Sequence, residues 1–538
     1  MAEYLYGTYG HLADSVVQAT AEASTVALYV GTAPVNLIRG YATAGIINTP
    51  VKINNYLDAQ TKIGDASDWD KYTLCEAVAA HFNNGDNVGP IYVINVLNPT
   101  THRKPTAKTV SLNFVNGKAS FTSEDIILDT LAIAGKAEGT DYAVTYGFTS
   151  HKVTIVSLDP DNPLSGAITA TYNEVDVSDI TVDDIIGSKT DAGVYTGLQA
   201  ADLIYPQFGA IVNLMAAPGW SQLPAVYRAL VTKATKLNGH WDSFVFADIP
   251  LSYDVDNFSE VTPEVGANPK NLGYYEKDAN DKYVLTEDET VDAGKQYYVK
   301  TTSTVYNDTL AEAAAWKANN GYTSERSCVF FPKAKGTDGN VYNISTLAMA
   351  ETLKRDLAHD GVPMETCGNK SVPVAKQYFG ASSTNAGFDA NEANDLCSNG
   401  IGTVVFWGGS WKLWGDHTAA YTFANTELDP RDIFDVSMRM LLYLTNAFQI
   451  RWAGSIDKPM TVQLKDTILT REQERLDALA AAGALIGTPK IVFEQAHNSL
   501  GNLRNGNFRW DIQVTPTPPL KSASAYVAYT DEGFAAYF

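Results

Sequence analysis

Several short segments combine residue types that could, at the right spacing, perform catalysis or bind a phosphate or a cation. Segment 218–221 (PGWS) approaches the Gly-x-Ser-x-Gly turn of serine hydrolases but lacks the second glycine. Segment 186–190 (IGSKT) resembles the end of a phosphate-binding loop, yet Val182 stands where that loop needs its first glycine. Segment 278–281 (DAND) begins like a calcium loop, but Lys282 occupies the next ligand position. None of the three segments therefore predicts a site.

The histidines, carboxylates and cysteines give no catalytic or metal-binding pattern either. The eight histidines are isolated, and His417, in a tryptophan-rich segment, is expected to be a packed or rim side chain rather than a base. No pair of carboxylates is set apart by apolar surroundings, as a general acid and base would be. No Cys-x-x-Cys pair occurs, so the cysteines are predicted to be buried, reduced thiols of a protein made in the cytoplasm: Cys75, Cys328, Cys367 and Cys397. We predict no catalytic residue, no cofactor and no metal, and a protein that is not an enzyme.

Length and charge limit the classes of function. The 538 residues correspond to about three or four domains, and 45% hydrophobic with 19% charged residues suffices for a large core. A formal net charge of −22 repels phosphate and anionic lipid, so we expect no nucleic-acid and no membrane partner. The first residues lack the basic and apolar regions of a signal peptide, and no apolar run reaches the length of a membrane span.

The negative charge is concentrated in two stretches. Residues 101–185 contain 6 basic and 12 acidic side chains, and residues 253–302 contain 5 and 11. Residues 452–521, in contrast, contain 8 basic and 7 acidic side chains. A nearly neutral C-terminal segment in an acidic chain is consistent with an acidic partner, and a chance local balance explains it equally well.

Apolar patterning predicts a covered, largely parallel sheet. A continuous apolar strand at 26–31 is followed by a helix at 72–82 and a second apolar strand at 91–97. Strands that are apolar along their whole length are typical of sheets covered on both faces. The same pattern continues with a strand at 210–215, a helix at 223–237, a strand at 244–248 and alternating elements from 305 to 450.

The two acidic stretches depart from this pattern. Residues 101–185 contain short alternating strands separated by turn signals at 116–117 (NG) and 159–163 (DPDNP), which predicts a small β-domain. Residues 253–302 predict a small β-meander rich in tyrosine. We expect both stretches to be insertions into the α/β core.

The last hundred residues predict a small α/β module. Strong amphipathic helices are expected at 433–448 and 462–482, and Gly483 is suited to end the second helix. Residues 508–514 alternate between apolar and polar side chains as a half-buried strand does. The prolines of segment 516–519 (PTPP) prevent that strand from continuing.

Both ends of the chain are predicted to be extended arms. Residues 522–529 form an apolar strand beyond the prolines, and a strand outside its own sheet is available to the sheet of another subunit. Residues 1–25 predict a second arm with scattered aromatic side chains. Pairing within the same domain and a frayed N-terminus are the alternatives. The arm residues that we expect to contact other subunits are Tyr4, Tyr6, Tyr9, Ala525, Tyr526, Val527, Ala528 and Tyr529.

Several segments occur in an informative order. Segment 399–403 (NGIGT) precedes segment 410–418 (SWKLWGDHT), which by itself predicts a packed loop. Further segments are 184–187 (DIIG), 197–198 (GL), 217–219 (APG), 457–459 (DKP), 483–486 (GALI), 498–499 (NS), Gly506 and 516–519 (PTPP). The order of these segments resembles the order of motifs in the contractile tail sheath family of phages and phage-derived particles. One of those motifs is the segment G-[IV]-x-T … W-G-x-[RH]-T. The resemblance covers about 26–98, 186–252 and 305–530 and is densest from Gly400 onward.

The resemblance implies an α/β (α+β) multidomain fold: a sheath-type α/β core with inserted β-rich domains and extended N- and C-terminal arms. The two acidic insertions depart from the shorter members of the family. The implied divisions are an N-terminal arm (1–25), three core parts (26–100, 186–252 and 304–450), an inserted acidic β-domain (101–185), a small inserted β-meander (253–303), a tube-facing α/β module (451–521) and a C-terminal arm strand (522–538).

The resemblance also implies a structural function. Subunits of this family stack helically as hexameric rings around a tail tube and contract to drive the tube through the host envelope. The implied partners are further copies of the chain, the tail tube protein, and the baseplate and tail terminator proteins, in a virion tail assembled in the host cytoplasm. The candidate tube-facing residues are Lys465, Arg471 and Arg475 on helix 462–482, where the two arginines share one face. The alternative is a solvated helix whose glutamates balance the arginines.

Three other functions are alternatives to a tail sheath. A hydrolase with a β-domain would need a nucleophile and a base, and the sequence offers neither. Another virion protein, such as a baseplate component, could share the sheath core. A sheath from a headless bacteriocin or a secretion-like device would follow the same subunit physics.

Overall fold

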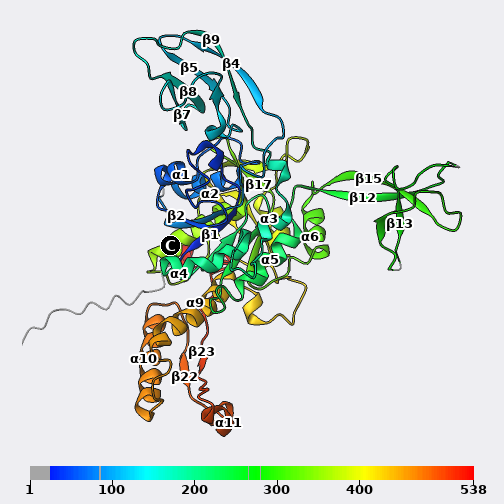
Figure 1. Ribbon diagram of the computed structural model, residues 1–538. Helices are drawn as coiled ribbons and strands as arrows, with labels where there is room; N and C mark the ends of the chain where they lie inside the picture. The colour runs from blue at the N-terminus through cyan, green and yellow to red at the C-terminus, as the bar shows by residue number, and fades with distance from the viewer. Residues whose placement is uncertain (1–24, 84–86, 265, 279, 538) are drawn as a thin grey trace, which may run out of the picture.

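The computed structural model describes residues 25–83, 87–264, 266–278 and 280–537, and an eight-stranded sheet lies at its centre (Figure 1). In spatial order its strands are β2 (Pro50–Ile53), β3 (Ile91–Asn95), β1 (Ala27–Gly31), β10 (Leu214–Ala216), β11 (Phe244–Asp248), β16 (Ser327–Phe330), β20 (Ile401–Trp407) and β21 (Ser410–Trp414). The six inner strands run parallel, whereas β2 and β21 pair antiparallel at the two edges.

Both faces of the inner strands are covered. β1, β3 and β11 are buried at every position, which is why their sequences are apolar throughout. Helices α2 (Thr73–Phe82) and α7 (Ile344–Ala358) pack on each other. Helix α2 also packs on β1, and α7 also packs on β11. Helix α5 (Pro224–Ala234) packs on β10 and β11. The predicted α/β class with a largely parallel sheet is confirmed.

Two core predictions were wrong in detail. The strand expected at 210–215 begins only at Leu214, and the side chain of the preceding Asn213 accepts a hydrogen bond from the Val26 N–H (3.1 Å). Segment 410–414, expected as a loop, is strand β21. Gly408 and Gly409 have φ of +60° and +87°, so they form a two-residue hairpin turn that places both tryptophans in the strand.

Residues 101–185 form two three-stranded sheets at the top of Figure 1. One contains β4 (Lys108–Phe114), β9 (Gly166–Tyr172) and β6 (Ala132–Ile133), and the other contains β5 (Lys118–Thr122), β8 (Lys152–Ser157) and β7 (Tyr142–Gly147). The expected turn at Asn116-Gly117 is present, with positive φ at both residues. The Asn36 amide of the core donates to the carbonyl oxygens of Glu124 (2.9 Å) and Ile126 (2.8 Å), which ties this region to the central sheet.

Residues 252–306 project from the core as a long antiparallel ribbon that ends in a small sheet (Figure 1). The ribbon consists of β12 (Ser252–Val261) and β15 (Tyr297–Tyr306), and the sheet adds β13 (Tyr275–Lys277) and β14 (Tyr283–Leu285). The rings of Phe258 and Tyr283 stack with their centroids 3.9 Å apart. Aromatic packing therefore replaces a conventional core in this small unit.

The C-terminal module lies below the core in Figure 1 and is joined to it by the long helix α9 (Asp435–Trp452). It contains α10 (Val462–Ala481), β22 (Lys490–Val492), α11 (Leu500–Arg504) and β23 (Asp511–Gln513), and the short helix α12 (Glu532–Tyr537) follows further on. Helix α10 and its end at Gly483 (φ +84°) are as predicted, whereas the strand expected at 508–514 is only three residues long.

The remaining elements complete the core. They are α1 (Tyr56–Lys62), α3 (Val182–Ile186), α4 (Ile204–Phe208), α6 (Leu310–Asn319), β17 (Lys333–Gly336), β18 (Val341–Asn343), β19 (Val374–Tyr378) and α8 (Ala390–Cys397). All four cysteines are buried and free, as predicted. No helix among the described residues combines the length and the apolar character needed to cross a bilayer.

Lys317 is a buried cation that holds segment 399–403 in place through backbone carbonyl groups. Its Nζ donates to the carbonyl oxygens of Asn399 (2.7 Å) and Ala419 (2.6 Å), and the residue is 4% exposed. Burial lowers the pKa of Lys317 from its ordinary 10.5 to about 8. The folded chain therefore binds fewer protons than the unfolded chain between these two pH values.

We expect the Lys317 effect to be visible as a pH dependence of stability. Because the lowered pKa favours the folded state as the lysine loses its proton, the free energy of unfolding should gain a rising contribution between pH 8 and 10.5. Lys317→Met should remove that rise, on the order of 3 kcal/mol over the window. Urea unfolding at several pH values measures it. The exposed Lys152→Met is the control, and equal slopes for both variants would contradict the assignment.

Candidate assembly site: arm roots and C-terminal module

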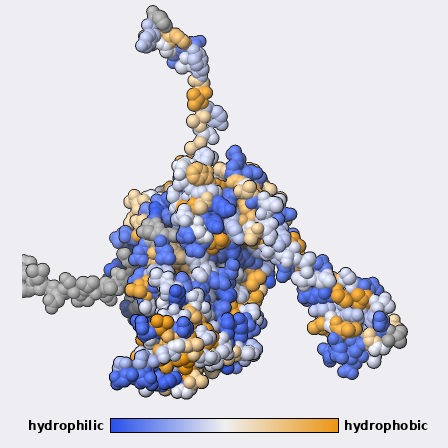
Figure 2. Space-filling model, turned by 90° about the horizontal axis from the view of Figure 1, so that it is seen from above, coloured by the Kyte–Doolittle hydropathy of each residue, from blue (hydrophilic) through white to orange (hydrophobic). Residues whose placement is uncertain are grey.

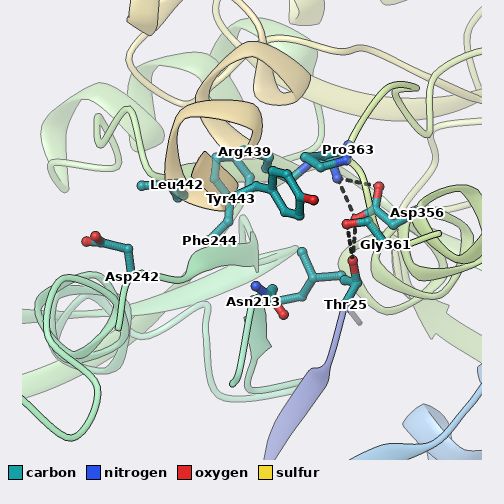
Figure 3. Close-up of a pocket in the computed structure, with 11 residues that line it drawn as sticks. Thr25, Asn213, Asp242, Phe244, Asp356, Gly361, Pro363, Arg439, Leu442 and Tyr443 are labelled. Atoms are coloured by element: carbon teal, nitrogen blue, oxygen red, sulfur yellow. Dashed lines mark hydrogen bonds and ion pairs between the residues drawn. The ribbon is translucent and has the colours of Figure 1, made fainter. Parts of the chain in front are cut away.

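The described chain begins at a point that is anchored to the core. Thr25, the first described residue, donates from Oγ1 to Asp356 Oδ2 (3.2 Å) and to the Gly361 carbonyl (3.3 Å), as Figure 3 shows. The next residue is fixed through its backbone N–H by Asn213. We call this point the N-terminal root. Tyr4, Tyr6 and Tyr9 lie outside the described residues.

A buried ion cluster on helix α9 supports this root. Arg439 Nη1 lies 2.8 Å from both carboxylate oxygens of Asp356, and its Nη2 donates to the Glu365 carbonyl (2.8 Å). Asp435, one turn earlier on α9, lies 3.7 Å from Arg439 Nε. Burial raises the pKa of Asp356, and it raises that of Asp435 to about 6, while Arg439 opposes both shifts. All three side chains are nearly fully buried, so the cluster is a fixed part of the core.

The C-terminal arm also leaves the core at an anchored point, which we call the C-terminal root. After the prolines the chain returns from the module to the core, where the Lys521 ammonium pairs with the buried Asp416 carboxylate. Leu520 and Lys521 line a pocket together with Trp407 and Trp414 of the β20–β21 hairpin. The N–H of Asp435 donates to the Asp416 carbonyl (3.0 Å). This root therefore contacts the N-terminal end of α9, the end that carries the ion cluster.

Beyond the C-terminal root the arm has no partner strand among the described residues. Residues 522–530 form no ladder hydrogen bonds, and Tyr526, Val527 and Tyr529 are 97%, 94% and 80% exposed. Figure 2 shows the arm as a thin projection that extends clear of the body. Ala525 and Ala528 are exposed as well. The alternative interpretation, pairing inside its own module, does not occur in the described chain.

The C-terminal module is fastened to α9 by a buried ion pair. Arg451, at the end of α9, donates from Nε to Glu472 Oε1 (2.9 Å) and pairs through Nη2 with the second oxygen. The Trp452 indole donates to the same carboxylate (2.6 Å). The Glu472 side chain is only 2% exposed, so these donors take the place of solvent around its carboxylate. These contacts bond the module directly to the end of α9.

The module also contains a small antiparallel sheet. Ile491 and Ile512 are opposite each other in the β22–β23 pair, and the pairing extends through hydrogen bonds of Ile486 to Thr515 (2.9 Å) and of Thr517 to Ala484 (3.1 Å). Only two strands belong to this sheet among the described residues, so each strand has an edge without a ladder partner there. Such edges accept an additional strand.

Comparison with known proteins shows a relationship over nearly the whole chain. No protein-family model matches the sequence. The chain is 24% identical over 545 residues to the tail sheath protein of Burkholderia phage BcepMu, a match that covers 94% of this chain and 96% of that protein. A shorter match, 25% identical over 148 residues, is to the major tail sheath protein of Serratia phage KSP20 and covers 28% of this chain and 35% of that protein.

This match over nearly the whole chain supports the contractile tail sheath family. A solved structure agrees in fold: a chain of the PVC sheath complex of an extracellular contractile injection system, in its contracted state, matches with a TM-score of 0.50 at 11% identity and 99% coverage of both chains. The protein is thus a structural sheath subunit, as the order of its motifs predicted. Within the described part of this subunit, no group of three or more His, Cys, Asp or Glu side chains could hold a metal ion.

The basic residues of the sheath subunit's helix α10 differ in their environments. Arg471 and Arg475 are exposed on the module surface. Lys465 is half-buried, with Nζ 3.2 Å from Asp466 Oδ1 and 6.0 Å from the centre of the Phe493 ring. The two arginines are therefore available to a partner, whereas Lys465 already has local partners.

The sequence contained one overlooked signal for the ion cluster of the sheath subunit. Arg439 interrupts an otherwise apolar run on helix 433–448, and a charge on the apolar face of a helix requires a buried partner. Asp416 lies within the tryptophan-rich segment, which was interpreted only as packing. Their partners Asp356 and Lys521 are about a hundred residues away, so spacing gave no indication of either pair.

We expect the Arg451–Glu472 pair to determine whether the module stays docked. Arg451→Met leaves a buried carboxylate without its charged partner, which costs about 3–5 kcal/mol. Amide hydrogen exchange across α10 should then accelerate by about a hundredfold or more, because opening of the module becomes easier. Arg471→Met, an exposed arginine of the same helix, is the matched control. Equal exchange in the two variants would show that the pair does not hold the module.

Proposed function

We propose that this sheath subunit polymerises with copies of itself as helically stacked hexameric rings around a tail tube, and contracts to drive that tube through the host envelope. The observation that carries this proposal is the exposed C-terminal arm. Three large apolar side chains, Tyr526, Val527 and Tyr529, face solvent beyond a firmly anchored root. Apolar residues of this kind, in a chain whose core is otherwise well buried, indicate a protein interface.

Strand exchange gives the arm a physical role. A strand added to the β22–β23 sheet of a neighbouring subunit would supply main-chain hydrogen bonds to an unpaired edge and bury the apolar side chains of the arm. Contacts between unlike faces that do not close within one ring generate an open helical tube. Because the arm between two anchored bodies is extended, it can act as a hinge while the bodies rotate as rigid units.

The C-terminal module is the surface we assign to the tail tube. Arg471 and Arg475 are exposed on α10, and residues 452–521 are nearly neutral in a strongly acidic chain. A partner with an acidic surface would be repelled by most of the subunit but not by this module. Baseplate and tail terminator proteins are the further partners at the two ends of the cylinder.

The two acidic projections belong, in this proposal, on the outside of the cylinder. Residues 101–185 and 253–302 leave the core in directions different from that of the C-terminal module (Figure 1). An outward position would keep their negative charge in solvent, where it maintains solubility and opposes premature closure of neighbouring subunits. The full-length relationship to a phage protein favours a virion tail, assembled in the host cytoplasm, over a headless device.

The arm is tested by truncation. A chain that ends after Lys521 keeps the C-terminal root but lacks residues 522–538, so it should fold normally and fail to form cylinders. Electron microscopy of purified protein at rising concentration provides the measurement, and circular dichroism confirms folding. Val527→Pro, which removes one main-chain donor from the full-length arm, should weaken assembly in the same direction. If the truncated chain formed cylinders, the arm would not be required for assembly.

The tube-facing assignment is tested by charge reversal. Arg471→Glu with Arg475→Glu should weaken binding of assembled sheath to purified tail tube about tenfold or more, because two favourable interface charges become repulsive. Co-sedimentation with the tube measures the effect. Lys118→Glu with Lys152→Glu changes the net charge equally on an exposed strand region far from the module, and it should leave tube binding unchanged. Equal losses in both double variants would indicate a general charge effect only.

A further inference from the structure

The C-terminal module contains a large apolar groove in addition to its sheet. The end of α9, the link 453–461, the first half of α10 and the loop 503–510 border it, and its volume is about 930 Å³. Its walls are largely aromatic and aliphatic: Phe448, Trp452, Ile456, Leu464, Ile468 and Trp510. Ile456 is 73% exposed. A groove of this composition on the surface of a folded chain indicates a binding site for an apolar segment.

The end of the C-terminal arm has the complementary properties. Helix α12 (Glu532–Tyr537) carries Phe534 and Tyr537, three positions apart and therefore on one side of the helix, and they are 58% and 88% exposed. A helix of six residues is not stable in water by itself, so it requires a surface to pack on. The body of its own chain does not cover the approach to this helix, because residues 521–534 are exposed throughout.

The charges of the helix and of the groove are opposite. Asp531 and Glu532 precede the two aromatic residues of the arm. The rim of the groove contributes three basic residues, Lys458, Arg504 and Arg509, against one acidic residue, Asp457, and Arg509 also pairs with Asp511 (2.6 Å). An acidic helix start next to a basic rim favours one orientation of α12, with its N-terminal end at the rim and its aromatic side chains directed inward.

We propose that α12 of one subunit docks in this groove of a second copy, with Phe534 and Tyr537 as the anchoring side chains. The inference rests on the proposed exchange of the arm strand and adds a second, side-chain-specific contact to it. If the arm pairs antiparallel with β23, its C-terminal end lies beside residues 508–510, which border the groove. The nine residues 522–530 span about 30 Å when extended, which is sufficient to bridge two subunits.

Disulfide trapping between two chains that each carry one added cysteine tests the docking. Gly533→Cys places a thiol on α12 without removing either aromatic residue, and Asn505→Cys places one on the rim of the groove. The native cysteines are all buried and do not compete. Oxidation of mixed cylinders should give a crosslinked dimer only when both variants are present. Gly533→Cys mixed with Asn162→Cys, an exposed position in the inserted β-domain, is the matched control and should give none.

A second pair of added cysteines distinguishes groove docking from the strand exchange on which it rests. Val527→Cys with Gln513→Cys reports pairing of the arm with β23. Crosslinks from this pair but not from the Gly533→Cys and Asn505→Cys pair would overturn the groove docking and leave strand exchange intact. Absence of both crosslinks in cylinders that do form would overturn strand exchange as well. If tail tube alone protected the thiol of the Asn505→Cys variant, and no crosslink to the Gly533→Cys variant formed, the groove would be assigned to the tube instead.

The energetic part of the proposal is tested by removing the anchors. Phe534→Ala with Tyr537→Ala should raise the critical concentration for cylinder formation about tenfold or more, because two aromatic side chains lose a buried site. Phe423→Ala, which removes a 74% exposed phenylalanine outside the arm, should leave it unchanged. An unchanged critical concentration for the double variant would contradict docking, since both aromatic side chains are largely exposed in the single subunit.

Discussion

The buried Arg439 guanidinium is the interaction on which the arrangement of this sheath subunit depends. It is held by both oxygens of Asp356 and lies near Asp435, and all three side chains are at most 3% exposed. Removing one member of such a cluster costs about 3–5 kcal/mol. Thr25 is attached to Asp356, and Asp416 is attached to the backbone of Asp435. Thr25 and Lys521 are therefore both anchored within reach of one helix.

Helix α9 extends this constraint into the C-terminal module. Its first half carries the ion cluster, and its last residues hold Glu472 of α10. A continuous helix that is bonded at both ends couples the core to the module, so a rigid-body rotation of one would carry the other with it. This division suits a subunit that must change its position relative to its neighbours while its own packing stays fixed.

The sequence was sufficient to predict the fold class of the core and the presence of the C-terminal helix 462–482. Strands such as 26–31 and 91–97 are apolar at every position, and only a sheet covered on both faces buries such strands. Helix 462–482 could be placed because its apolar period and the glycine that ends it are local signals. The tryptophan-rich hairpin was misjudged, because whether two glycines make a loop or a tight turn depends on a partner strand.

What only the tertiary structure decided is which distant groups meet. Arg439 with Asp356, Lys521 with Asp416 and Arg451 with Glu472 are each joined across at least twenty residues of chain, and no local period encodes such pairs. Hydrophobic periodicity determines elements because it reports which face of a helix or strand is buried. The partner of a buried charge is determined by how those elements cross, which depends on the packing of the whole core. The sequence by itself thus determined most of the elements and the resemblance to the family, and the folded structure determined which distant groups anchor Thr25 and Lys521.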